Sequence, residues 1–199
     1  MQDSKNQRID EVKSAVSTVE GWLKKEGIKN LYTYALEAPT STIVEIGSWK
    51  GKSTSCLAFA VKDRGEGRVY AIDTWKGSSE HQKVLKHYEE DQLYQEFLEN
   101  MSKLNLLDVI QPIKMDSVEA SRIWPIQKKI GLLYIDGSHE YELVKRDFEF
   151  WSPFVAEGGY IIFDDVPSWS GPTQLVNELP DWYKFIDIRG NHGIYQKLN

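Results

Sequence analysis

The stretch VEIGSWKGKST, residues 44–54, decides the fold of this chain. Its first residues complete a predicted strand, TIVEI at 42–46, the chain turns between Gly47 and Gly51, and a predicted helix follows at 51–61. Glycines in such a turn allow a ligand to approach the backbone closely, and the free N-terminus of the helix can receive a carboxylate. The stretch therefore predicts a strand, a turn and a helix with a ligand site at the turn.

Two phosphate-binding motifs do not match this turn. A P-loop needs four residues between its glycines, whereas three separate Gly47 from Gly51, and Ile46 stands where a P-loop needs glycine. The dinucleotide-binding pattern needs further glycines where this chain has Trp49 and Lys52. The remaining Gly-x-x-x-Gly turn fits either a ligand without a polyphosphate or an ordinary turn between strand and helix.

Strands and helices alternate along the rest of the chain. Further strands are predicted at 68–73, 109–114, 130–135 and 160–163, and further helices at 91–104, 117–123, 140–151 and 173–179. Such alternation implies parallel strands joined by right-handed crossovers, with helices on both faces. Two final runs, 183–188 and 193–197, flank the turn RGNHG and predict a hairpin. The predicted fold class is α/β: a Rossmann-like, doubly wound, seven-stranded sheet, mostly parallel, with an antiparallel C-terminal hairpin strand.

The first thirty residues carry a separate helical pattern. Apolar residues recur every three or four positions and form one stripe, made of Ile9, Val12, Val16, Val19 and Leu23. We expect this helix, at 9–22, to pack on the domain or on a second subunit, so the chain could form a homo-oligomer through it. The predicted organisation is therefore an N-terminal helical extension at 1–30 and one domain at 31–199.

Composition places the chain among compact soluble domains. It contains 24 Lys and Arg and 30 Asp and Glu among 199 residues, a formal net charge of −6. This acidic balance, with no Lys- or Arg-rich run, argues against binding nucleic acid through its phosphates. The longest apolar runs fall far short of the ~20 residues that cross a bilayer, and the N-terminus has no apolar signal region. We therefore expect no nucleic-acid partner, no membrane partner and a cytoplasmic location, which the single cysteine, Cys56, also favours.

Polar side chains stand at the carboxyl ends of the predicted strands, where ligands bind in such sheets. Asp73 ends the second strand, where a carboxylate can accept hydrogen bonds from both hydroxyls of a ribose. Asp116 and Ser117 follow the third strand and can meet the edge of an adenine, although Asp116 can equally cap the helix after it. Together with the glycine turn, these residues predict a nucleoside site.

Three further carboxylates are predicted to converge at the same edge. Asp136 ends the fourth strand, and the pair Asp164 and Asp165 ends the fifth. Three anions so placed repel one another unless a proton or a cation neutralises them, and oxygen ligands suit Mg²⁺ first, with Ca²⁺ or Mn²⁺ as alternatives. The other interpretation is that Asp164 or Asp165 caps a turn before Pro167. The pattern therefore predicts a divalent metal site and leaves the cap as its alternative.

Five segments carry a resemblance to a known family: VEIGSWKGKST, YAIDTW, IKMDS, LLYIDGSHEYELVKRDFEFW and EGGYIIFDDV. In this order they resemble the motifs of class I S-adenosylmethionine-dependent methyltransferases, most closely the metal-dependent sugar and macrocin-type O-methyltransferases and the cephalosporin-hydroxylase-like proteins. The resemblance covers residues 43–166 and implies that 31–199 is a class I methyltransferase domain. It implies that Glu45, Gly47 and Gly51 frame the methionine part of the cofactor, that Asp73 holds its ribose and that Asp116 and Ser117 contact its adenine, with Ser48, Ser53, Trp75 and Asp136 completing the cofactor site.

The resemblance also implies an activity. The enzyme would transfer a methyl group from S-adenosylmethionine to a hydroxyl of a small acceptor, such as a sugar, a glycoside or a natural product. Asp136, Asp164 and Asp165 would bind the divalent cation, most simply Mg²⁺. His139 would act as the base, since histidine takes a proton near neutral pH, while other members of the branch use a nearby Asp.

Alternatives stay open at this point. The same fold could methylate nitrogen, which needs neither a metal nor a strong base, or could bind the cofactor without catalysis. Trp49 and Trp169 are expected to line the acceptor pocket, since aromatic faces stack on rings and sugars. His81 lies either in an acceptor-binding segment or, more simply, on a solvated polar helix.

Overall fold

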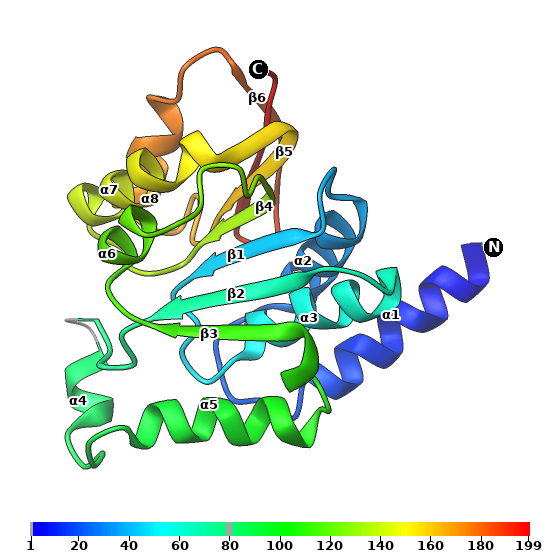
Figure 1. Ribbon diagram of the computed structural model, residues 1–199, viewed down its shortest axis with the longest axis vertical. Coiled ribbons are helices and arrows are strands. Elements are labelled where there is room, and N and C mark those ends of the chain that lie inside the picture. The colour runs from blue at the N-terminus through cyan, green and yellow to red at the C-terminus, as the bar shows by residue number, and fades with distance from the viewer. Residues whose placement is uncertain (1, 79–80) are drawn as a thin grey trace.

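The computed structural model describes residues 2–78 and 81–199, and these residues form one seven-stranded sheet in the order β3-β2-β1-β4-β5-β7-β6 (Figure 1). The strands are β1 Thr42–Ile46, β2 Arg68–Asp73, β3 Ile110–Lys114, β4 Ile130–Ile135, β5 Val155–Phe163, β6 Tyr183–Arg189 and β7 His192–Lys197. The first five strands pair in parallel, and β7 pairs antiparallel with both β5 and β6. The predicted fold class is confirmed, although β5 begins five residues before the predicted position.

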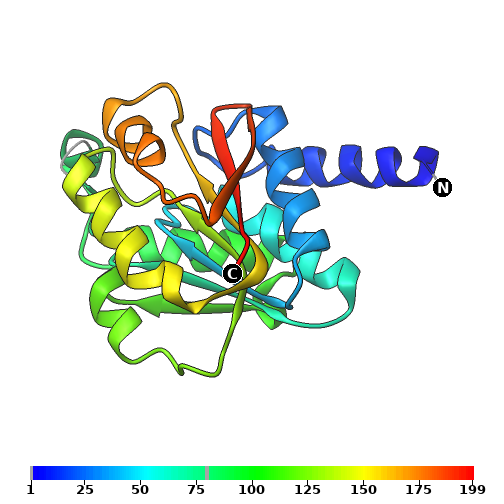
Figure 2. The same cartoon turned by 90° about the horizontal axis from the view of Figure 1, so that it is seen from above.

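Helices cover both faces of the sheet (Figure 2). They are α1 Gln2–Val16, α2 Lys25–Glu37, α3 Lys52–Arg64, α4 Gln82–Leu85, α5 Gln92–Lys103, α6 Ser117–Arg122, α7 Tyr141–Trp151 and α8 Ser170–Asn177. Buried residues of α1, α2, α3 and α5 form one apolar core with the sheet, and those of α6, α7 and α8 form the other. The sheet is therefore doubly wound.

The central strands are apolar because both of their faces are covered. All six residues of β4, IGLLYI, are buried, and so are four of the five residues of β1. Continuous apolar runs of this kind are typical of strands inside a parallel sheet. The chain runs from β1 outward to β2 and β3, and then returns to β4 on the other side of β1. A crevice forms at such a switch point, beyond the carboxyl ends of β1 and β4.

The N-terminal residues differ from the predicted single helix at 9–22. α1 ends at Val16, although the stripe residues Ile9, Val12 and Val19 are buried as expected. The second helix, α2, is absent from the sequence prediction, because Gly27 and Asn30 are weak helix formers. Packing compensates: the side chain of Asn30 donates to the carbonyl of Arg189 at 2.8 Å. The boundary expected between residues 30 and 31 falls inside α2.

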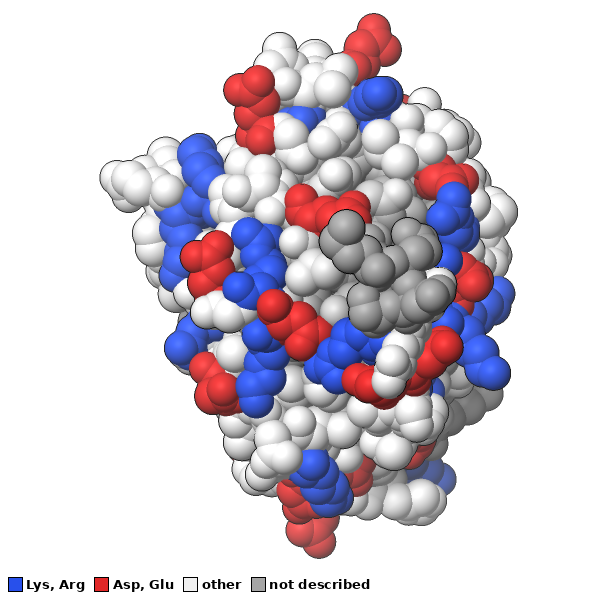
Figure 3. Space-filling view, turned by 90° about the vertical axis from the view of Figure 1, so that its right-hand side faces the viewer, with Lys and Arg blue, Asp and Glu red and all other residues white. Residues whose placement is uncertain are grey.

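Two features bear on the expected absence of nucleic-acid and membrane partners: helix length and surface charge. Among the described residues, no helix is long and apolar enough to cross a membrane. On the face seen in Figure 3, Lys and Arg side chains are interspersed with Asp and Glu. The expected lack of a nucleic-acid or membrane partner stays a prediction.

Candidate active site

A cleft of about 600 Å³ opens beyond the carboxyl ends of the parallel strands. Nine of the residues predicted for the site line it: Gly47, Ser53, Asp73, Asp116, Ser117, Asp136, His139, Asp164 and Asp165. Trp49 and Trp169, expected at the acceptor pocket, line it as well. The structure thus brings together residues that lie more than a hundred positions apart.

The register of β1 and β4 makes glycine necessary at position 47. Ile46 lies opposite Ile135, so the next residues, Gly47 and Asp136, meet where the strands end. Gly47 has φ 85°, and a Cβ atom there would lie 2.2 Å from the backbone oxygen of Asp136. A side chain at this position would push the two strand ends apart, so the turn depends on glycine.

Asp73 organises the glycine turn from β2. Its Oδ2 accepts hydrogen bonds from the backbone N–H groups of Ser48 and Trp49, both at 2.9 Å. Its Oδ1 accepts from the backbone N–H of Trp75 at 2.7 Å. A carboxylate has about four lone-pair sites, so these three bonds use most of its acceptor capacity. Asp73 can accept a hydrogen bond from a ribose hydroxyl only with its remaining lone pair. Its main role is to hold the glycine turn in place.

Four predicted cofactor residues do not line the cleft: Glu45, Ser48, Gly51 and Trp75. Glu45 lies beneath the turn, fully buried, and accepts hydrogen bonds from Ser48 Oγ at 2.7 Å and from Thr54 Oγ1. Burial raises the pKa of Glu45 to about 7, although the hydroxyl donors lower it. Glu45 therefore supports the turn from below.

The other members of this group also act through packing. Trp75 lies in the core against Tyr94 and Phe97, and its Nε1 donates to the carbonyl of Trp49 at 2.8 Å. Trp49 itself has φ 49°, a left-handed conformation that costs a bulky residue roughly 1–2 kcal/mol. Hydrogen bonds to the backbone N–H and to the carbonyl of Trp49 hold it in this conformation. Gly51 has φ 89°, a left-handed conformation that favours glycine, and a Cβ there would also displace the flexible end of Met101, 2.5 Å away.

The predicted adenine end contains a carboxylate that the sequence interpretation missed. Asp116 caps α6, accepting from the backbone N–H of Val118 at 2.9 Å, so its alternative role as a helix cap is present. The hydroxyl of Ser117 donates to Asp147, which lines the cleft, and burial raises the pKa of Asp147 to about 6. Asp147 shares the buried face of α7 with Phe148, and a charged residue on an apolar stripe is the signal that would have identified it.

The three carboxylates at the ends of β4 and β5 each have a partner within the chain. Asp165 Oδ2 lies 2.6 Å from His139 Nε2, and Asp165 Oδ1 accepts from Asn191 at 2.5 Å. Asp164 Oδ1 lies 3.1 Å from Nε2 of the fully buried His192. Asp136 accepts a hydrogen bond from the hydroxyl of Tyr134 at 3.2 Å. Burial and the negative charge of Asp164 hold the pKa of Asp136 well above its ordinary value.

The predicted metal site is not confirmed by this arrangement. Across the described ranges, no group of three or more His, Cys, Asp and Glu residues is arranged to hold a metal ion. Asp164 lies against His192, and Asp165 lies against His139 and Asn191. A divalent cation would have to draw these carboxylates away from their present partners.

His139 is held on two sides. Its Nε2 pairs with Asp165, and its ring stacks on Trp169 with the ring centroids 4.1 Å apart and the planes 14° apart. With Nε2–H donated to the carboxylate, Nδ1 is the nitrogen that carries the lone pair. A histidine oriented by a carboxylate in a cleft is the arrangement of a general base.

Comparison with known proteins shows which family this chain resembles. A family model described as a methyltransferase domain matches residues 44–166. The uncharacterized protein R132 of Acanthamoeba polyphaga mimivirus is 25% identical over 135 residues, which are 68% of this chain and 56% of that protein. The uncharacterized protein y4gI of Sinorhizobium fredii is 29% identical over 127 residues, 62% of this chain but 13% of that protein. This chain thus spans about half the length of the first relative and a small part of the second.

Solved structures with the same fold include several methyltransferases. The O-methyltransferase NovP has a TM-score of 0.65 at 20% identity, covering 86% of this chain and 79% of that one. CalS11, a TDP-rhamnose 3'-O-methyltransferase of calicheamicin biosynthesis, has a TM-score of 0.58 at 18% identity, with coverages of 85% and 76%. The SAH-bound methyltransferase PaMTH1 of Podospora anserina has a TM-score of 0.66 at 11% identity, with coverages of 96% and 88%. Since the family model covers more than half of the 199 residues, this chain belongs to the methyltransferase-domain family, and the predicted methyltransferase class is confirmed.

Proposed function

We propose that this chain transfers a methyl group from S-adenosylmethionine to a hydroxyl oxygen of a small acceptor, such as a sugar, a glycoside or a natural product. The observation that carries the proposal is the pair of His139 and Asp165 in the same cleft as the glycine turn. Oxygen is a poor nucleophile until its proton is removed, and a held histidine can remove it. NovP is an O-methyltransferase and CalS11 is a TDP-rhamnose 3'-O-methyltransferase, and both support the choice of oxygen.

The cofactor would lie along the ends of β1, β2 and β3. Gly47 lets it approach the backbone, Asp73 offers its remaining lone pair to the ribose, and Ser117 and Asp147 face the adenine end. S-adenosylmethionine supplies an electrophilic methyl group on a cationic sulfur. The acidic lining of the cleft, which includes Asp73 and Asp136, favours a cationic ligand over an anionic one.

His139 would remove the proton as the oxygen attacks. Asp165 lies against Nε2 of His139, orients the ring, and stabilises the imidazolium that forms when the ring takes the acceptor proton. Trp169 covers one face of the ring and limits its rotation. Positioning of this kind contributes because the methyl group, the oxygen and the base must align in one geometry.

The Mg²⁺ dependence that the sequence predicts stays a separate prediction. Support for it comes from charge: three carboxylates line one cleft, and their mutual repulsion contributes to the raised pKa of Asp136. Treatment with EDTA, followed by return of Mg²⁺, tests it. Turnover that falls with EDTA and returns with Mg²⁺ would support a cation, and unchanged turnover would remove it from the proposal.

Calorimetry and a turnover assay test the proposed function. We expect S-adenosylmethionine and S-adenosylhomocysteine to bind, and an acceptor panel of phenols, sugars and glycosides to yield S-adenosylhomocysteine and a methyl ether. Methylation of amines alone would favour nitrogen transfer. Cofactor binding with no methylated product from any acceptor would favour a non-catalytic module, and no cofactor binding would refute the proposal.

A further inference from the structure

The segment between α1 and α2 forms part of the cleft although it lies outside the region that matches the family model. Gly21, Trp22 and Leu23 line the cleft, whereas the match begins at residue 44. These residues belong to the predicted N-terminal extension, and none of the five methyltransferase-like segments includes them. The structure therefore adds to the site a wall that comes from outside the matched domain.

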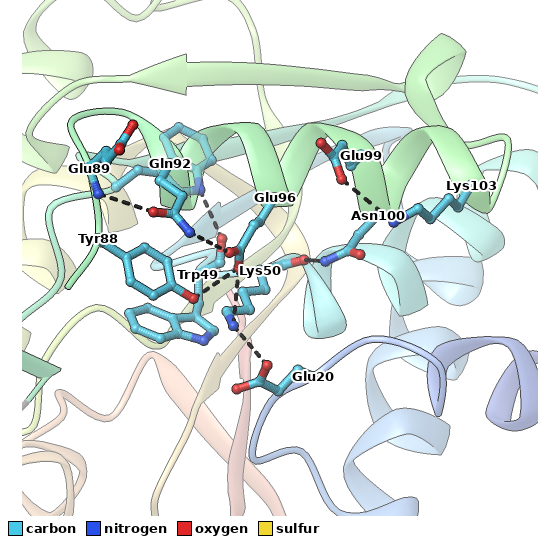
Figure 4. A network of polar contacts seen from close by, with 11 residues as sticks. Glu20, Trp49, Lys50, Tyr88, Glu89, Gln92, Glu96, Glu99, Asn100 and Lys103 are labelled. Carbon is cyan, nitrogen blue, oxygen red and sulfur yellow. Dashed lines mark hydrogen bonds and ion pairs between the residues drawn. The ribbon is translucent and has the colours of Figure 1, made fainter. Parts of the chain in front are cut away.

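A buried lysine ties this segment to the glycine turn (Figure 4). Lys50 is 7% exposed, and its Nζ lies 2.7 Å from Glu20 and 3.1 Å from Glu96 of α5. Burial lowers the pKa of Lys50, but the partners Glu20, Tyr88 and Glu96 outweigh burial and raise the pKa above its ordinary value. The lysine is therefore charged and joins the N-terminal segment to α5.

A second lysine fixes the next residue. Lys52 Nζ donates to the carbonyl of Gly21 at 3.0 Å. Lys50 and Lys52 flank Gly51 in the glycine turn, so both anchors connect the segment to the element that forms the base of the cleft. Trp22 follows Gly21 in the chain, so these two contacts hold the backbone on its N-terminal side.

Trp22 completes an aromatic cluster at the mouth of the cleft. Its ring stacks on His81, with centroids 5.3 Å apart and planes 16° apart, and lies 5.7 Å from the ring of Trp49. Trp49 and His81 are themselves 4.5 Å apart. Yet Trp22 remains 70% exposed, which leaves most of a large apolar ring in contact with water. Removing this apolar ring from water is favourable, and the flat ring of a ligand can do so by stacking face to face on it.

A second exposed aromatic ring lines the cleft beside His139. Trp169, which stacks on His139, lines the same cleft and is 44% exposed. The rest of the lining around His139 is acidic, with Asp136, Asp164 and Asp165. This negative charge disfavours an anionic acceptor. An uncharged aromatic ring can stack on the exposed rings and is not repelled by the carboxylates.

We propose that Trp22 is a specificity-determining residue that stacks on an uncharged, hydroxyl-bearing aromatic ring. The proposal rests on the proposed function in that this ring carries the hydroxyl that His139 would deprotonate. Glu20, through Lys50, is the positioning residue that keeps Trp22 at the mouth. The expected acceptors are thus phenols and catechols rather than free sugars.

Binding of catechol, measured by calorimetry with methyl α-glucoside as the sugar comparison, tests this assignment. We expect catechol to bind the wild type more tightly than the glucoside. Trp22→Ala should weaken catechol binding about tenfold, the effect of losing one stacked ring, and Trp22→Phe should stay within about threefold. The matched control is Trp182→Ala, because Trp182 is 51% exposed and does not line the cleft.

A pair of glutamates tests the anchor. Glu20→Gln breaks the contact with Lys50, and we expect catechol to bind about two- to threefold more weakly. Glu99→Gln breaks an ion pair with Lys103 elsewhere on α5, at nearly equal exposure, and should change nothing. Thermal denaturation of each variant verifies that it is folded.

The outcomes separate this proposal from the proposed function. Equal catechol binding by the wild type and Trp22→Ala, or no catechol binding by the wild type, overturns the role of Trp22. A wild type that prefers the glucoside also overturns it. Binding of S-adenosylhomocysteine is measured alongside: if catechol binding depends on Trp22 but the cofactor does not bind, the aromatic site stands and methyl transfer fails.

Discussion

His139 Nε2 lies 2.6 Å from Asp165 Oδ2, a contact that joins the loop after β4 to the end of β5. Asn191, in the turn between β6 and β7, donates to the other oxygen of the same carboxylate at 2.5 Å. Three segments of the chain thus fix one imidazole ring. The contact explains how a histidine in a loop can keep the orientation that a base requires.

Removal of the imidazole should remove most of the turnover. We expect His139→Ala to lower kcat about 10²- to 10⁴-fold, the range for loss of a general base, with little change in S-adenosylmethionine affinity. A steady-state methyl transfer assay measures kcat, and calorimetry measures the affinity for S-adenosylmethionine. His87→Ala, an exposed histidine that does not line the cleft, is the control. Normal turnover by His139→Ala would show that another group is the base.

A divalent cation and His139 should compete for Asp165. Because the imidazole donates to this carboxylate, its removal frees an oxygen ligand, and we expect His139→Ala to bind Mg²⁺ about tenfold more tightly than the wild type. The double variant His139→Ala, Asp165→Asn should lose this gain. Calorimetric titration with Mg²⁺ measures both. Equal Mg²⁺ affinities in the wild type and His139→Ala would mean that the carboxylate does not take part in cation binding.

The close approach of two strand ends makes Gly47 more sensitive than other glycines with positive φ. Gly65 has φ 75°, and a Cβ atom added there would meet no atom within 4 Å, so Gly65→Ala should cost about 1 kcal/mol from backbone strain alone. Gly47→Ala adds a clash with a main-chain oxygen and should cost about 3 kcal/mol or more, with loss of cofactor binding. Urea unfolding measures both costs. Similar losses in the two variants would show that the strand ends can separate easily.

The buried carboxyl of Glu45 should make stability fall as the pH rises. Its pKa is about 7 in the folded protein and near 4.5 when exposed, so the folded state binds this proton more tightly. The stabilisation is complete below about pH 4.5 and is lost as the pH rises through 7, a change on the order of 3 kcal/mol. In Glu45→Gln, which keeps the hydroxyl contacts, this part of the pH dependence should vanish.

Urea unfolding at a series of pH values between about 4 and 8 compares the wild type with Glu45→Gln. Other buried acids, such as Asp147, change stability in the same direction, so the difference between the two proteins isolates Glu45. Glu99→Gln, an exposed control, should follow the wild type. A profile of Glu45→Gln that parallels the wild type would mean that Glu45 titrates at its ordinary pKa.

Much of the fold could be predicted because it depends on local patterns. The strands at 42–46, 68–73 and 130–135 match their predicted bounds to the residue, since short apolar runs bounded by turns leave little choice. The glycine turn also predicted a ligand site at the end of the first strand, and the cleft lies there. Helix α2 escaped prediction although Ile28, Leu31 and Ala35 recur at helical spacing, because Gly27 and Asn30 weaken the pattern and packing on α3 and the hairpin supplies stability.

By itself, then, the sequence determined the order of the strands and helices from β1 onward, the edge of the sheet that carries the site, and nine of the predicted site residues that line the cleft. The tertiary structure decided what each polar group does there: Glu45 beneath the turn, Asp73 bound to it, Asp165 paired with His139, and Trp22 brought to the mouth. The physical reason is range. Hydrophobic periodicity and turn chemistry act over a few residues, whereas a hydrogen bond is made or missed within about 3 Å, and only the packed chain sets that distance.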